Sequence, residues 1–100
     1  MRYSTPDLEG NRLAYKGRRF WIVEVLPGSS FQGFGPTEAG EFVVYDRYYD
    51  GPLALVMRSQ DGRLLATTIT YLESQCEAST LKELAQKVYF IVDAEMRAMG

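Results

Sequence analysis

The residues best suited to chemistry in this sequence lie in the segment EFVVYDRYYDGPL, residues 41–53. Tyr45, Tyr48 and Tyr49 stand there close to a single arginine, Arg47. Tyrosine and arginine are typical of binding hot spots, because each combines a large contact area with hydrogen-bonding groups. The same residue types also build the stacking platforms that bind single-stranded nucleic acids. The segment therefore predicts a binding surface on one face of the strand, with aromatic residues that fill the junction between the sheet and the helix as the alternative.

A second candidate is the glycine- and proline-rich segment of residues 27–40, which contains Phe31 and Phe34. Its phenylalanines either tuck over an open end of the sheet as core residues or are presented to a partner. Long connections without secondary structure are often functional. Phosphate binding is disfavoured, because no Gly-Lys-Ser/Thr motif and no helix follows the glycines. We therefore include Phe31 and Phe34 in the predicted binding surface.

Four basic residues form a third group, and no acidic residue lies between positions 10 and 23. This basic group consists of Arg12, Lys16, Arg18 and Arg19. A turn with four positive charges beside a β surface is able to contact phosphates, which makes it a candidate nucleic-acid contact. The whole chain, however, has 13 acidic and 11 basic residues and a net charge of −2. A solvated hairpin is thus the simpler interpretation, and nucleic acid is the alternative partner.

Catalytic and metal chemistry find little support in the sequence. It has no histidine, which excludes Ser-His-Asp and Cys-His machinery and the usual zinc ligand. The single cysteine, Cys76, stands between Glu73 and Glu77, and negative neighbours raise the pKa of a thiol. Carboxylate oxygens remain, but they lack the spacing of a calcium loop: Glu41, Asp46 and Asp50. We expect no catalytic residue, no metal and no cofactor.

One further carboxylate, Glu24, interrupts the apolar run FWIVEVL. A carboxyl group buried at that point would be a candidate for a small-ligand carrier or an enzyme. A side chain that faces solvent at a strand edge would carry no such function, and this is the simpler expectation.

The elements that position these residues are mostly β-strands. Bulky and β-branched residues separated by Lys-Gly, Pro-Gly, Asp-Gly-Pro and Asp-Gly turns predict five strands over residues 11–72, after a loose lead-in at residues 1–10. The second long strand is expected at residues 41–49. Five strands with short turns predict an α+β fold with an antiparallel meander curled into a half-barrel. This layout resembles SH3-like small barrels, which implies architecture only.

A C-terminal helix is predicted over residues 79–99. Thr80 and Glu83 match a capping box, and apolar residues follow at helical spacing. The stretch VYFIV, residues 88–92, covers a full turn, and Phe90 points about 200° away from Val88. The helix should therefore be buried on two sides, unless the stretch is a strand. If Tyr89 and Phe90 are exposed instead, an isologous dimer through this helix would cover them.

Length and composition set the class of protein. The chain has 100 residues, 46% of them hydrophobic and 24% charged, as expected for one globular domain. One cysteine and the lack of any long apolar run predict a cytoplasmic protein without membrane contact. We expect a non-enzymatic protein-binding module with a protein partner of unknown identity. Small inhibitors and adaptors that act by surface occlusion, such as those of phages and mobile elements, are of this kind. The alternative is a single-stranded nucleic-acid-binding small β-barrel.

Overall fold

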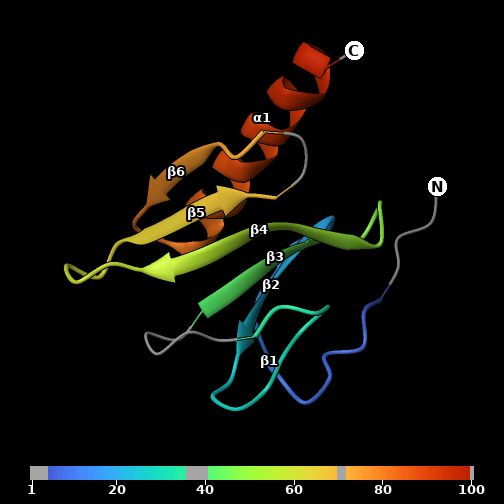
Figure 1. The fold of residues 1–100 in the computed structure, drawn as a ribbon, viewed down its shortest axis with the longest axis vertical. Coiled ribbons are helices and arrows are strands. Elements are labelled where there is room, and N and C mark those ends of the chain that lie inside the picture. Colours follow the sequence, from blue (N-terminus) through green and yellow to red (C-terminus); the bar gives the residue numbers. More distant parts are fainter. Residues whose placement is uncertain (1–4, 36–40, 70–71, 100) are drawn as a thin grey trace.

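The fold is a six-stranded antiparallel meander with one C-terminal helix (Figure 1). The computed structural model describes residues 5–35, 41–69 and 72–99. Each strand pairs with its neighbour in the chain, so the sheet order equals the sequence order. The elements are β1 (Arg12–Lys16), β2 (Phe20–Val25), β3 (Glu41–Asp46), β4 (Gly51–Arg58), β5 (Leu64–Thr68), β6 (Gln75–Ala78) and α1 (Leu81–Met99).

The prediction of five strands is wrong, because β6 is a sixth. This strand pairs antiparallel with β5, with Cys76 opposite Ala66. Its sequence, QCEA, contains no β-branched or aromatic residue, so the pattern gives no strand signal. Pairing along β5 supplies the stability that local propensity lacks. Within the described residues β1 and β6 form the two edges of the sheet, and closure into an SH3-like half-barrel is not confirmed.

Strand β3 is also shorter than predicted, since it ends at Asp46 and not at Tyr49. The Asp46 carboxylate accepts a hydrogen bond from the backbone N–H of Tyr48 at 2.8 Å. Such local side-chain bonds compete with the strand ladder. Asp50 then adopts a left-handed φ of 56° before β4 begins. Tyr48 and Tyr49 therefore lie in the β3–β4 turn, where their rings meet edge to face at 5.0 Å.

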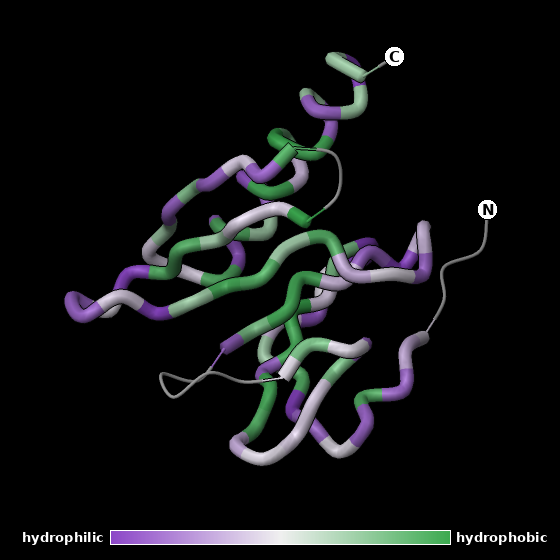
Figure 2. The backbone as a smooth tube through the Cα atoms, in the orientation of Figure 1, coloured by the Kyte–Doolittle hydropathy of each residue, from purple (hydrophilic) through white to green (hydrophobic). Residues whose placement is uncertain are grey.

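One face of the sheet packs against α1 and forms the main core (Figures 1 and 2). Alternate residues of the strands point to this face, and α1 contributes residues at helical spacing. The buried members at its centre are Phe20, Ile22, Phe42, Val44, Val56, Leu84 and Val88. Leu84, Val88 and Val92 form a single stripe along the helix, as expected for an amphipathic helix on a sheet.

The opposite face of β2 and β3 carries a second core. Because both faces of these strands are buried, their sequences are nearly continuous apolar runs. Its buried residues are Val23, Val25, Phe31, Val43 and Tyr45. Phe31 comes from the segment after β2, and its ring meets that of Tyr45 at 5.8 Å. The aromatic residues of β3 thus serve two different cores, one on each face of the sheet.

The segment after β2 is fixed to the sheet by a tight turn and a buried amide. Phe31 and Phe34 exchange backbone hydrogen bonds of 2.7 and 2.9 Å. Between them Gln32 and Gly33 both have left-handed φ angles, the pattern of a two-residue hairpin. The buried Asn11 side chain donates to the carbonyls of Leu8 and Ser30 and accepts from the Leu26 N–H. This one amide ties the lead-in before β1 to the segment that covers the second core.

Helix α1 starts as the capping pattern predicts, because the Glu83 N–H donates to the Thr80 hydroxyl at 3.2 Å. The prediction that it is buried on two sides is wrong. Val88 and Val92 are buried, but the Phe90 side chain is 68% exposed. In the described residues no helix is long and apolar enough to cross a membrane.

Candidate functional site

A buried ion pair stands at the centre of the site. Arg19, just before β2, donates through Nε and Nη2 to the two carboxylate oxygens of Asp46 at 3.1 and 3.0 Å. Asp46 is fully buried, whereas the Arg19 side chain is 30% exposed. The hydrogen bonds to Asp46 raise the pKa of the Arg19 guanidinium, against the opposing effect of burial. The two-pronged geometry fixes the guanidinium plane in one orientation.

Four aromatic rings surround the same guanidinium, and we call this group the Arg19 cluster. The distances from Arg19 Cζ to the ring centroids are 5.1 Å for Phe20, 5.1 Å for Tyr48, 5.5 Å for Tyr49 and 5.7 Å for Tyr89. All four lie within the range of cation–π attraction. The rings come from β2, the β3–β4 turn and α1, so Arg19 joins three parts of the chain.

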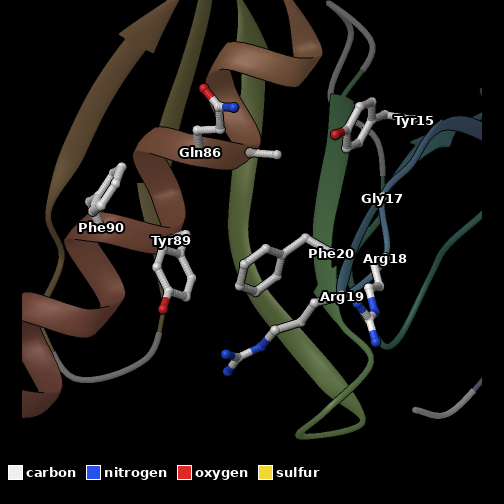
Figure 3. Close-up of a pocket in the computed structure, with 9 residues that line it drawn as sticks. Tyr15, Gly17, Arg18, Arg19, Phe20, Gln86, Tyr89 and Phe90 are labelled. Atoms are coloured by element: carbon white, nitrogen blue, oxygen red, sulfur yellow. The ribbon is translucent and has the colours of Figure 1, made fainter.

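Next to this cluster a cleft of about 410 Å³ opens between the β1–β2 hairpin and α1. We call it the hairpin–helix cleft. Figure 3 shows the rings of Phe20, from the hairpin wall, and Tyr89, from the helix wall, next to each other, and their ring centroids are 5.7 Å apart. Its lining residues are Tyr15, Gly17, Arg18, Arg19, Phe20, Ala85, Gln86, Tyr89 and Phe90.

Gly17 sets the shape of the hairpin wall. Its N–H donates to the Phe20 carbonyl at 3.0 Å. A Cβ atom at this position would lie 2.6 Å from that carbonyl oxygen and 3.0 Å from the Tyr15 ring. Glycine is therefore required by close approach, and it holds Tyr15 and Phe20 on the wall of the cleft.

The structure brings together residues that the sequence placed in three separate groups. Tyr48 and Tyr49, from the predicted tyrosine strand, lie against Arg19 of the basic group, and Tyr89 of the helix lies against the same guanidinium. Phe90 continues the surface through its contact with Tyr89, with ring centroids 5.6 Å apart. Exposed fractions are 39% for Tyr48, 49% for Tyr49 and 40% for Tyr89.

Other residues of the predicted binding surface lie elsewhere. Phe31 and Tyr45 are buried in the second core, and Phe34 is partly buried beside them. The Tyr45 hydroxyl donates to the Asp50 carboxylate, and burial together with Asp50 raises the pKa of Tyr45. Arg47 lies over the Trp21 ring at 4.8 Å and donates to the Arg18 carbonyl at 2.8 Å.

The predicted basic group is partly neutralised within the fold. Arg12 pairs with Glu24 at 3.6 Å, and Arg19 pairs with Asp46. Lys16 lies over the Trp21 ring at 5.6 Å. Glu24, the candidate carboxylate of a ligand carrier, is partly exposed in its pair with Arg12. These pairs weaken the case for phosphate contacts and for an enzyme at Glu24.

Sequence reasoning did not foresee that three carboxylates are buried: Glu41, Asp46 and Glu95. Glu95 accepts hydrogen bonds from the hydroxyls of Thr68 and Ser74, both at 2.8 Å. It therefore joins the last turns of α1 to the end of β5. A signal was present, because Glu95 lies three residues after Val92 on the apolar side of the helix. Nothing local marks Asp46, since its partner is 27 residues away.

Little in the described residues points to reactive chemistry. Burial raises the pKa of the Cys76 thiol, against the opposing effect of Lys87. In residues 5–35, 41–69 and 72–99 no three His, Cys, Asp or Glu side chains are grouped so that they could hold a metal ion.

Comparison with known proteins gives no matching family model, no matching curated protein and no matching solved structure. The residues of this chain therefore carry the evidence for its function. They offer an exposed aromatic surface around a fixed arginine and a cleft beside it.

Proposed function

We propose that the protein is a non-enzymatic protein-binding module that acts by covering a surface of its partner. The observation that carries the proposal is the connected set of exposed rings Tyr48, Tyr49, Tyr89 and Phe90 around Arg19. Tyrosine and arginine are enriched among the residues that dominate binding energy at interfaces. Here they are gathered on one surface from three parts of the chain.

The rigidity of this surface supports the proposal. Ordering a flexible side chain on binding costs about 0.5–1.5 kcal/mol. The bonds from Arg19 to Asp46 hold the guanidinium in place, and the guanidinium in turn lies against Tyr48, Tyr49 and Tyr89. Much of the ordering cost is therefore met during folding. A surface prepared in this way favours recognition of a defined partner.

We further propose that this binding module is a small inhibitor or adaptor. A small single domain whose sequence has no histidine suits an inhibitor or adaptor, including those that phages and mobile elements encode. We place the protein in the cytoplasm, because its one cysteine is an unpaired thiol, which suits a reducing compartment.

The proposal is tested by affinity capture with the tagged protein from a lysate of its host, with and without nuclease. Phe90→Ala removes the most exposed ring, and Met57→Ala is the matched control. Met57 is 43% exposed and lies near the far end of β4, about 20 Å along the strand from the β3–β4 turn. We expect to recover one partner protein in stoichiometric amount, both with and without nuclease. Its recovery should be unchanged with Met57→Ala and lost with Phe90→Ala.

Two other results would contradict the proposal. Recovery that disappears with nuclease would favour the nucleic-acid alternative. Recovery of only the tagged chain's own copies would favour the homodimer through Tyr89 and Phe90. In that case light scattering should give a dimer mass for the wild type and a monomer mass for Phe90→Glu.

A further inference from the structure

Most basic side chains of the described residues have a partner within the protein. Five pair with a carboxylate at 3.6 Å or less: Arg12, Arg19, Arg63, Lys87 and Arg97. Three more lie over an aromatic ring within 5.7 Å: Lys16, Arg47 and Arg58. Among the basic residues that the structure describes, this leaves Arg18 and Lys82, both exposed, without an ion pair or a ring contact.

The two unpaired cations flank the same cleft. Arg18 lines the hairpin wall of the hairpin–helix cleft. Lys82 lies one helical turn before Gln86, which lines the helix wall, so both side chains share one face of α1. The N-terminus of α1, at Leu81, adds the positive end of the helix dipole beside Lys82.

Acidic side chains near the cleft do not offset these charges. No carboxylate is found among its described lining residues. Asp46 is bonded to Arg19, and on α1 Glu83 pairs with Lys87 at 3.3 Å. Asp93 borders a smaller adjoining pocket of about 90 Å³ and pairs with Arg97 at 3.0 Å. The cleft is therefore apolar inside and positive at its rim.

We propose that the hairpin–helix cleft binds an acidic peptide segment of the protein partner. One large apolar side chain enters between the hairpin wall and the helix wall of the cleft, and Asp or Glu residues on either side of it pair with Arg18 and Lys82. This inference rests on the proposed function and gives the chemistry of the partner. A volume of about 410 Å³ lies within the range of about 300–1,000 Å³ found for ligand pockets, so it accepts a side chain with its neighbouring backbone.

The test compares dye-labelled peptides by fluorescence anisotropy at low and physiological salt. The acidic probe is GSEEFEEGS, and the neutral probe is GSQQFQQGS, which has the same shape without the charges. We expect the acidic probe to bind at least about tenfold more tightly at low salt, or about 1.4 kcal/mol. The advantage should shrink at physiological salt, because exposed charges are screened.

Variants assign that preference to the two cations. The double variant Arg18→Gln/Lys82→Gln should bind both probes equally and keep the affinity of the wild type for the neutral probe. The double variant Arg58→Gln/Arg63→Gln makes the same change in net charge beside the β4–β5 turn, away from the cleft, and should keep the preference. Phe90→Ala should weaken both probes.

Three outcomes would overturn the inference: equal binding of the two probes by the wild type, no binding of either probe, or a preference that survives Arg18→Gln/Lys82→Gln. Each leaves the affinity capture of a protein partner unaffected, so the proposed function is judged separately. A capture experiment that recovers no protein would refute the proposed function even if the probes show the charge preference.

Discussion

The ion pair between Arg19 and Asp46 makes an asymmetric prediction about stability. Because Asp46 is fully buried and Arg19 is 30% exposed, the two partners are not equivalent. In Arg19→Met the carboxylate stays buried without its countercharge. In Asp46→Leu the guanidinium is able to turn toward water, because one side of it is already exposed. Arg19→Met should therefore be the more damaging of the two substitutions.

The magnitude follows from the burial of the pair. Breaking a buried ion pair by removing one partner costs about 3–5 kcal/mol. Water already reaches Arg19, and methionine keeps apolar contact with the surrounding rings, so we expect the lower end, about 3 kcal/mol. The double variant Arg19→Met/Asp46→Leu removes both charges. It should recover at least half of that loss, because apolar replacements of buried pairs are often neutral or stabilising.

Urea denaturation monitored by circular dichroism measures these values at pH 7. The expected order of unfolding free energies is wild type, double variant, Asp46→Leu and Arg19→Met, with similar m values. A loss below about 1 kcal/mol for Arg19→Met would place the pair among exposed salt bridges and refute our reasoning. So would a double variant as unstable as Arg19→Met, because the damage would then not come from an uncompensated charge.

Three further predictions concern other parts of the fold. Burial raises the pKa of Tyr45 above its unfolded value, so its contribution to stability is complete below about pH 10 and declines as pH rises further; thermal melts between pH 8 and 11 should show a smaller decline for Tyr45→Phe, and equal declines would contradict this. Thr80→Ala removes the cap of α1 and should cost about 1 kcal/mol in urea, whereas Thr80→Ser should cost little. Glu95→Ala leaves the Ser74 hydroxyl without its acceptor, whereas Thr68 is still able to donate to the Leu72 carbonyl; the substitution should cost about 1–3 kcal/mol, and an unchanged urea midpoint would show that water replaces the carboxylate.

Parts of the fold with local signals were predictable from the sequence. The capping pattern at Thr80 marks the start of α1, and the helix begins one residue later. Asp61 and Gly62 mark the β4–β5 turn, where Gly62 has a φ of 87° that glycine accommodates without strain. In each case the residues that specify the structure are neighbours in the chain. The information therefore does not depend on tertiary packing.

Features that depend on distant residues were not predictable. Strand β6 has no strand signal of its own and exists because β5 offers a partner. Asp46 reads as a solvent-facing strand end, yet it is buried, because Arg19 reaches it from 27 positions away. The burial of Tyr45 depends on Phe31 folding back over the second face. A periodic pattern assigns side chains to faces, but it does not say what covers each face.

The candidate site was also predictable only in part. Its residue types were visible, since Tyr48, Tyr49, Arg19, Tyr89 and Phe90 each stood out in the sequence. Their assembly into one surface was not, because it requires both the β3–β4 turn and α1 to bring their rings to Arg19.

The double role of Arg19 restricts how affinity is able to evolve. Any change at Arg19 or Asp46 alters the fold and the tyrosine surface together, so adaptation to a new partner through these positions would carry a stability cost. Arg18, Lys82 and Phe90 lie at the rim, and the side chains of the two cations have no ion-pair or ring contact among the described residues. Substitutions there should change binding with little effect on folding. Natural variants with new specificity, and libraries built to obtain one, should therefore differ at these three positions and keep the Arg19–Asp46 pair.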